Sequence, residues 1–380
     1  MQRFLVVGKS KYVVLAVLQA IQSHTDAEVF VLGDQETQAM RWSSLCREKL
    51  AIRFDGSGDG AFLAMVKRLA SGHPDTMLLP VDCDGIRLVN RVRHQIGIGI
   101  GPIPSQQILE TFDDKWLFHQ FCESHGLRVP PTRFIGGKEA LDFAALEAEF
   151  GLPFVVKPSN MAGSIGVQIV GSREEFEANI LYNPSYKHSS LIVQRYIDGF
   201  DIDLSLLADH GVLCAFAIQR VNGSRIEFLP NPYLEMVAAN ICRLSGFNGV
   251  MHIDARIDSR TGAVYLIECN PRYWASLTAC VLCGLNFVAQ SIAPSATERG
   301  VQRLIAGGAS CRHPLLLPSS WKDLAMDATY LGRLLRAKAL DPYSVAQFGR
   351  ELSDSCLRLA QKKIVLPWHA RGAHQSAAKP

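Results

Sequence analysis

Short hydrophobic runs alternate with amphipathic stretches over about the first hundred residues of the chain. Segments 2–7 (QRFLVV), 28–32 (EVFVL) and 76–81 (TMLLPV) have the pattern of buried strands, and 11–22 repeats apolar residues at helical spacing. Strands that alternate with helices predict an open parallel sheet. Segment 97–105 (GIGIGPIPS) is rich in Gly and Pro, which indicates a domain boundary there.

The rest of the chain predicts helices, then strands, then helices again. Helical patterns cover 115–126 and 141–151. From 191 to 270 five strand patterns follow one another, with Gly, Asp or Asn at the joins, and we expect them to form an antiparallel sheet. The tail is expected to be helical at 330–340 and 345–363, with the last ten residues disordered.

The length of 380 residues exceeds what one hydrophobic core usually serves. The fold class is accordingly predicted as α/β: a parallel-sheet domain, then an α+β unit with antiparallel sheets, then a helical C-terminal extension. The expected divisions are 1–105, 106–190, 191–300 and 301–380.

Composition narrows the class of protein. Hydrophobic residues make up 48% and charged residues 20%, with a net charge of +3, as in ordinary globular enzymes. Basic residues are scattered, so a nucleic-acid partner is not expected. No apolar run approaches the roughly 18 residues of a membrane span, and the N-terminus lacks a signal-peptide pattern. We therefore expect a soluble, cytoplasmic protein.

The ten cysteines include one lone CxxC, Cys280 and Cys283, which we interpret as helix-packing thiols.

Two strand patterns, 249–258 (GVMHIDARID) and 263–270 (AVYLIECN), carry the most informative polar side chains. Alternate residues of a strand share a face, so Glu268 and Asn270 lie together. If the hairpin closes near 261, Asp254 lies directly across from Glu268, because cross-strand partners have a constant index sum.

Two facing carboxylates repel each other unless a cation lies between them. A divalent ion on oxygen ligands, with Asn270 adding a carbonyl, would remove that conflict. A solvated polar face on an edge hairpin is the alternative. Arg256 and His252 share the face of the first acid, but a lone histidine is more often structural and is not assigned a role.

Segment 154–170 (FVVKPSNMAGSIGVQIV) places Lys157 on a strand before a loop that contains Gly163, Ser164 and Gly166. Glycines let backbone N–H groups approach phosphate oxygens, and a lysine on a strand supplies a fixed positive charge. The pattern fits a lid over a nucleotide, and it equally fits an ordinary hairpin loop.

Segment 191–205 (LIVQRYIDGFDIDLS) leads from a buried strand through Gln194, Tyr196 and Ile197 to two acids after Gly199. Such a segment can bind adenine through its backbone and a ribose hydroxyl through a carboxylate. By itself it predicts no more than strand, turn and strand.

In this order the segments resemble the ATP-grasp superfamily, in particular its carbamoyl-phosphate synthetase and amino-acid ligase branch. The resemblance covers about residues 105–290, and the first hundred residues resemble the domain that precedes ATP-grasp units. Four motifs at compatible spacings are more specific than any one of them.

The resemblance implies a nucleotide-binding set: Lys115 in DDKWLFHQF, Lys157, the lid 162–167 with Gly163, Ser164 and Gly166, the adenine hinge Gln194, Arg195, Tyr196 and Ile197, and the ribose-binding Asp201. It implies the magnesium ligands Asp254, Glu268 and Asn270. Gln194 and Asp201 stand where glutamate is frequent in the family, and both keep hydrogen-bonding capacity.

The resemblance also implies ATP and Mg²⁺ as cofactors, with Mn²⁺ as a substitute, and catalysis by positioning and electrostatics. Next to the metal ligands, Arg272 is the candidate for holding the substrate carboxylate or the transferred phosphoryl group, and a surface ion pair is its alternative role. Lys157 and Arg256 are the further catalytic candidates.

The expected activity is that of an ATP-dependent carboxylate-amine ligase that forms an acyl phosphate and releases ADP and phosphate. The alternatives are a carboxylating or carbamoyl-forming ATP-grasp enzyme and an ATP-binding regulatory protein without turnover. The expected partners are a small carboxylate and a small amine. A homodimer contact through the helical tail stays open, and the identity of both substrates is not specified by these motifs.

Overall fold

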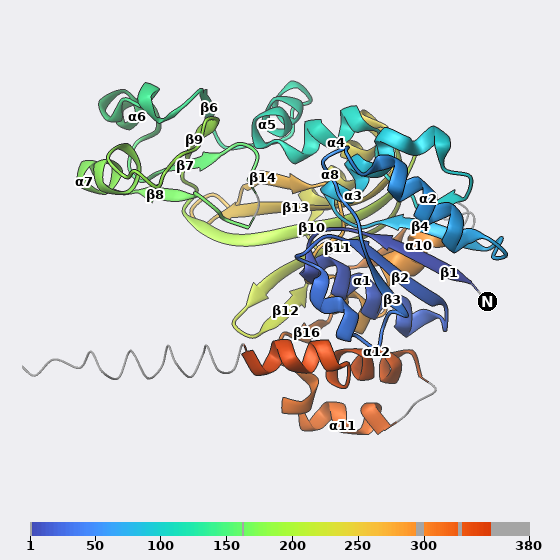
Figure 1. The fold of residues 1–380 in the computed structure, drawn as a ribbon. Coiled ribbons are helices and arrows are strands. Elements are labelled where there is room, and N and C mark those ends of the chain that lie inside the picture. Colours follow the sequence, from blue (N-terminus) through green and yellow to red (C-terminus); the bar gives the residue numbers. More distant parts are fainter. Residues whose placement is uncertain (1, 162, 294–299, 326–328, 351–380) are drawn as a thin grey trace, which may run out of the picture.

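The computed structural model describes residues 2–161, 163–293, 300–325 and 329–350. Three sheets organise these residues, and the smallest of them projects from the body of the molecule (Figure 1). The expected disorder of the last ten residues and the helix expected beyond 350 lie outside the described residues.

The first sheet is parallel, as predicted, and its five strands follow the order β3-β2-β1-β4-β5. These strands are β1 (Arg3–Val7), β2 (Glu28–Gly33), β3 (Glu48–Ala51), β4 (Thr76–Pro80) and β5 (Gly99–Ile100). The helices that belong to this part are α1 (Lys11–His24), α2 (Asp59–Ala70) and α3 (Cys83–Val92). Runs such as RFLVV are buried on both faces, because helices cover both sides of the sheet.

The smallest sheet has four antiparallel strands in the order β6-β9-β7-β8. They are β6 (Thr132–Ile135), β7 (Phe154–Pro158), β8 (Gln168–Val170) and β9 (Leu191–Arg195), with the helices α6 (Phe143–Phe150) and α7 (Arg173–Phe176). Phe143, Phe154 and Phe176 pack together in its core. We call this part, residues 132–195, the small lobe.

The prediction of one antiparallel sheet from 191 to 270 was wrong at both its start and its middle. Strand β9 pairs with β6 and β7 of the small lobe, because strand propensity does not specify which partner a strand finds. Residues 232–245 form a helix, α8 (Pro232–Ser245), that was not predicted. Its signals are an Asn231 cap, a proline in the first turn and a left-handed Gly246 at the end.

The largest sheet follows the order β14-β13-β10-β11-β12-β16, and β15 pairs with β11. Its strands are β10 (Gly199–Asp209), β11 (Val212–Asn222), β12 (Arg225–Phe228), β13 (Gly249–Asp258), β14 (Val264–Asn270), β15 (Gln302–Leu304) and β16 (Gly308–Ser310). Residues of α8, α4 (Gln106–Asp113) and α5 (Lys115–Ser124) share one hydrophobic core with β10, β11, β13 and β14.

The C-terminal helices pack against the first domain or against one another. They are α9 (Leu277–Leu282), α10 (Phe287–Ile292), α11 (Pro318–Ala325) and α12 (Tyr330–Ala339), and residues 342–350 are also helical. Asp341 accepts hydrogen bonds from Ser43 Oγ at 2.9 Å and from the Ser44 backbone at 2.7 Å, which ties this region to the first sheet. The helical tail is thus confirmed at α12, while the boundaries at 105, 190 and 300 stay predictions.

Two predicted absences can be compared with the described residues. No helix among them is both long enough and apolar enough to cross a bilayer. Their cysteines are all free thiols, and Cys280 is fully buried on α9, as expected for a packing residue.

Candidate functional site

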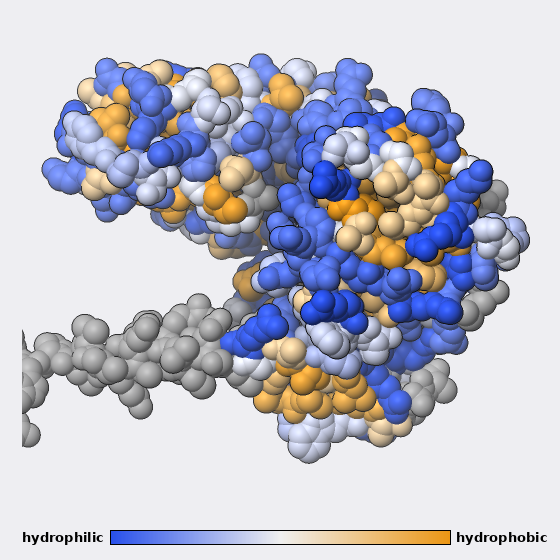
Figure 2. All heavy atoms as spheres, in the orientation of Figure 1, coloured by the Kyte–Doolittle hydropathy of each residue, from blue (hydrophilic) through white to orange (hydrophobic). Residues whose placement is uncertain are grey.

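A cavity of about 900 Å³ lies between the small lobe and the large sheet. Strands β7 and β9 and the segment after β9 line one side, and β10, β11, β13 and β14 line the other. Figure 2 shows the hollow that separates the projecting small lobe from the body. A volume of this order suits a nucleotide-sized ligand.

Two lysines enter this cavity from different elements. Lys157 lies on β7 and is 3% exposed, and Lys115 is the first residue of α5 and is 7% exposed. Asp114 caps α5 through the backbone N–H groups of Trp116 and Leu117, and it accepts the Ser159 hydroxyl at 2.7 Å. The start of α5 is therefore fastened to the end of β7, which brings the two amines toward one place.

Both lysines face the carboxylate of Glu268. Lys115 Nζ lies 3.3 Å from Glu268 Oε2 and donates to the Met161 carbonyl oxygen. Burial lowers the pKa of Lys157 to about 8, although the charge of Glu268 opposes the shift. A buried amine of this kind is a strong donor to any phosphate that displaces water from the cavity.

Asp254 on β13 pairs with Glu268 on β14, as the index sum predicted. Burial raises the pKa of Glu268, and the negative charge of Asp254 also raises it, while the positive charges of Lys115 and Lys157 lower it. Burial also acts to raise the pKa of Asp254, but the hydrogen bond and charge of His252, together with Glu268 and Arg272, outweigh burial, so that this pKa lies below its ordinary value. Two neighbouring carboxylates whose pKa values shift in opposite directions repel each other, and a divalent cation between them would offset that repulsion.

Asn270 and Arg272 lie just beyond this pair. Asn270 is in register with His252, and its Oδ1 accepts a hydrogen bond from Arg272 Nη2 at 2.8 Å. Arg272 Nη1 donates to the Tyr273 carbonyl at 2.8 Å. The carboxylates of Asp254 and Glu268 and the amide of Asn270 are hard oxygen donors, which fit Mg²⁺.

Two polar residues at the site were not assigned a role from the sequence. Asp203 on β10 lies directly across from Asp254, and burial raises its pKa to about 6. His252 donates or accepts at Ser205 Oγ over 2.9 Å, and its Nε2 lies 3.2 Å from Asp254 Oδ1. One ligand atom each from Asp203, His252 and Asp254 lie within 4.8 Å of one another.

A signal for these two residues is present in the sequence. Asp201, Asp203 and Ser205 alternate along β10 and therefore share a face, as His252 and Asp254 do on β13. Only the pairing of β10 with β13 places the two faces together. That pairing joins segments about fifty residues apart and could not be read locally.

The hinge residues lie where β9 leaves the small lobe. Gln194, Arg195, Tyr196 and Ile197 all line the cavity. The Gln194 side chain is buried and donates to Thr132 Oγ1 at 2.9 Å, so it anchors β9 to β6. The backbone of the following residues is left to face the cavity.

Arg256 fastens this hinge to β13. Its Nε donates to the Ile197 carbonyl at 2.6 Å and its Nη2 to the Gly199 carbonyl at 2.8 Å. Nη1 forms an ion pair with Asp201, whose side chain is 75% exposed. The guanidinium is thus hydrogen-bonded to the hinge. On the face of β13 that carries His252, Asp254 and Arg256, it lies at the opposite end from His252.

The glycine-rich loop has a left-handed backbone at three of its residues. Gly163, Ser164 and Gly166 all have positive φ, at 67°, 61° and 74°. Ser164 lines the cavity, and the Gly166 carbonyl accepts from Tyr186 Oη at 2.8 Å. A Cβ at Gly166 would collide with Pro158. Ala162, at the start of the expected lid, lies outside the described residues.

Known proteins resemble this chain over the same region. Residues 122–233 match the family model described as D-ala D-ala ligase C-terminus. A D-alanine–D-alanine ligase of Nitrosospira multiformis is 27% identical over 175 residues, which are 41% of this chain and 56% of that protein. An arginine-specific carbamoyl phosphate synthase large chain of Bacillus subtilis is 26% identical over 183 residues, 44% of this chain and 17% of that protein. The chain spans less than two thirds of either relative.

Solved structures extend the likeness to most of the chain. The biotin carboxylase domain of the 2-oxoglutarate carboxylase of Hydrogenobacter thermophilus, solved with MgADP and bicarbonate, has a TM-score of 0.57 at 16% identity and covers 79% of this chain and 71% of that one. The L-amino acid ligase of Bacillus licheniformis has a TM-score of 0.55 at 14% identity and covers 77% and 73%. The chain therefore has the ATP-grasp fold, and it resembles the carbamoyl-phosphate synthetase and amino-acid ligase branch of that superfamily.

Proposed function

We propose that this chain is an ATP-dependent carboxylate-amine ligase. In the proposed reaction the carboxylate attacks the γ-phosphorus of ATP and ADP leaves, and the amine then attacks the acyl carbon and releases phosphate. The observation that carries the proposal is the meeting of Lys115 and Lys157 with Asp254 and Glu268 in one cavity. The matches to a D-alanine–D-alanine ligase and to an L-amino acid ligase support an amine as acceptor.

The nucleotide would lie with its base at the hinge and its phosphates at the lysines. Backbone groups of Arg195, Tyr196 and Ile197 would bind adenine, and Asp201 would accept a ribose hydroxyl. Arg256 would act as a positioning residue, because its donors hold the hinge carbonyls and Asp201 in place. This proposed role replaces direct contact with the reacting groups.

The phosphates would be gripped from two sides. Lys115 and Lys157 would donate to the β- and γ-phosphate oxygens, and the backbone N–H groups of Gly163, Ser164 and Gly166 would cover them. Glycine adopts the positive φ angles of Gly163 and Gly166 without strain and lets the backbone approach a ligand closely.

Asp254, Glu268 and Asn270 would hold Mg²⁺, and Mn²⁺ could take the same oxygens. When bound, the ion neutralises charge on the triphosphate as the phosphoryl group is transferred. Arg272 lies beside Asn270 and would hold the substrate carboxylate or the transferred phosphoryl group, exchanging its present bond to the amide for a bidentate one. The cytoplasmic location and the homodimer stay predictions.

The test is ADP and phosphate release with ATP and Mg²⁺, measured with amino acids and other small carboxylates singly and in pairs, followed by mass spectrometry of the product. An amide product whose formation needs both partners supports the proposal. ADP release that needs bicarbonate instead would indicate a carboxylating enzyme. Nucleotide binding without substrate-dependent release would indicate a regulatory protein.

Glu268→Gln supplies the matched internal test. The amide keeps the size of the side chain but removes a charge from the proposed cation site, so we expect turnover to fall by at least about a hundredfold. Glu147→Gln makes the same chemical change on the exposed face of α6 and should leave turnover unchanged. Full activity in the Glu268 variant would contradict the assigned metal ligands.

A further inference from the structure

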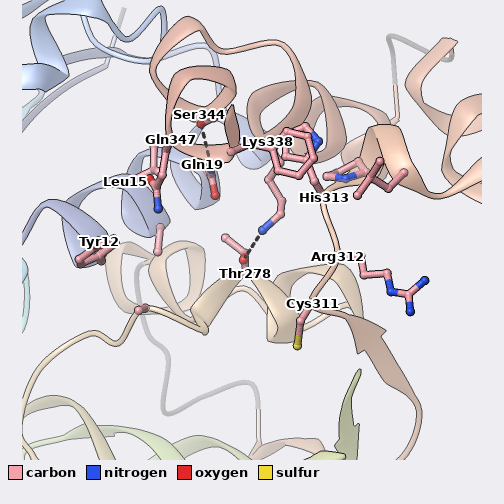
Figure 3. Close-up of a pocket in the computed structure, with 15 residues that line it drawn as sticks. Tyr12, Leu15, Gln19, Thr278, Cys311, Arg312, His313, Lys338, Ser344 and Gln347 are labelled. Atoms are coloured by element: carbon pink, nitrogen blue, oxygen red, sulfur yellow. Dashed lines mark hydrogen bonds between the residues drawn. The ribbon is translucent and has the colours of Figure 1, made fainter. Parts of the chain in front are cut away.

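A second cavity, of about 490 Å³, lies where the C-terminal helices pack over α1 and α9 (Figure 3). Its walls come from α1, from residues 275–278, from residues 311–316, from the end of α12 at Lys338 and from residues 344–348. It shares no lining residue with the cavity at the hinge. The proposed ligase activity therefore leaves this cavity without a role.

Lys338 is the central polar group of this cavity. It extends from α12 toward α9, where its Nζ donates to Thr278 Oγ1 at 2.9 Å (Figure 3). No carboxylate among the described residues forms an ion pair with this amine, and the nearby Asp341 instead accepts hydrogen bonds from Ser43 and Ser344. Burial lowers the pKa of Lys338 to about 8.

The lining leaves the charge of this amine uncompensated. The cavity is lined by Lys338 and by the exposed Arg312, and it has no aspartate or glutamate among its lining residues. Lys338 is half-buried, and a cation withdrawn from water is ordinarily paired, because removing a charge from water is costly without a counter-charge. Leu15 and Phe348 add apolar surface to the same cavity.

We propose that this cavity binds a small organic carboxylate. One carboxylate oxygen accepts from the Lys338 ammonium and another from the Thr278 hydroxyl, which is free to donate while it accepts from the amine. The body of the ligand packs against the apolar side of the cavity. With no acid in the lining to receive an ammonium group, the site selects a carboxylate that lacks a free amine.

The test compares charged and neutral ligands of one shape on the full chain. Calorimetric titration with acetate, benzoate and 3-phenylpropionate should give saturable binding of at least one of them, while benzamide, the neutral analogue of benzoate, should not bind. Lys338→Met should weaken carboxylate binding by about tenfold or more, because it removes a charge-assisted hydrogen bond. Lys322→Met, which removes an exposed lysine of α11, should bind as the unchanged protein does.

A second measurement uses the unchanged protein and so does not depend on whether a variant folds. Acetic anhydride near pH 8 should acylate Lys338, whose lowered pKa leaves part of the amine neutral, and mass spectrometry can follow that peptide. The carboxylate that binds should slow this acylation, and benzamide should not. MgADP affinity should be the same with and without the carboxylate, which separates this site from the proposed nucleotide site. Equal behaviour of benzoate and benzamide, or no protection by any of the three acids, would overturn the proposal.

Discussion

The positive charge of Lys157, which we propose binds ATP, destabilises the folded protein because the amine is buried. Its side chain is 3% exposed, and burial lowers its pKa from 10.5 to about 8. Since one pKa unit corresponds to about 1.4 kcal/mol, the charged amine costs the folded protein about 3 kcal/mol at neutral pH. Lys157→Met removes the charge at similar length. We expect it to raise the free energy of unfolding by about 2–3 kcal/mol, because the net pKa of Lys157 already includes the opposing attraction to Glu268.

The pH dependence has a definite sign. The folded protein releases the Lys157 proton near pH 8, while the unfolded chain holds it until about pH 10.5, so the unfolded state binds more protons in this window. Wild-type stability should therefore rise with pH there, and the cost of the amine should fall to about 1–1.5 kcal/mol near pH 9.5. The advantage of the methionine variant should shrink by about half or more.

Urea unfolding followed by circular dichroism near pH 7 and near pH 9.5 measures both effects. Lys67→Met, which removes an exposed lysine of α2, is the control and should change stability by less than about 0.5 kcal/mol. Turnover of the Lys157 variant should fall by about 10²- to 10³-fold, since a donor to the transferred phosphoryl group is lost. The reasoning would be refuted if Lys157→Met were less stable than wild type, or if the difference in their free energies of unfolding did not change with pH.

Three further changes test other parts of the site. Gly199→Ala would place a Cβ against a carbonyl oxygen of β13 and should cost about 3 kcal/mol or more in unfolding experiments, whereas Gly97→Ala, which meets no atom within 4 Å, should cost little. Arg256→Met frees the hinge, so KM for ATP should rise about tenfold or more while kcat changes less, as steady-state kinetics would show; an unchanged KM would contradict the positioning role. Mn²⁺ binding can be titrated by electron paramagnetic resonance. Glu268→Gln should weaken that binding by at least about tenfold, and Asp203→Asn should weaken it less. A larger effect of Asp203→Asn would indicate that the cation binds at the cluster of Asp203, His252 and Asp254 instead.

The local sequence determined the identity of most elements and much of the site. The strand patterns of the first domain, the helix after Asp114 and the helix α1 were correctly predicted, because their signals lie within one turn or one strand, but α1 is buried on all sides from Val13 to Ile21 rather than amphipathic. The facing of Asp254 and Glu268 was also predicted, although a shift of one residue in register between Asp254 and Ala255, which the sequence did not indicate, contributes to it. These are properties of neighbours along the chain.

The tertiary structure decided which strands share a sheet and which side chains share a cavity. Nothing local indicates that β9 joins the small lobe, that Asp203 meets Asp254, or that Arg256 grips the hinge. Nor does the sequence show that Lys338 donates to Thr278 of α9, because that contact joins residues sixty positions apart. Such contacts depend on how separate hydrophobic faces pack to exclude water, and that packing is a property of the whole chain.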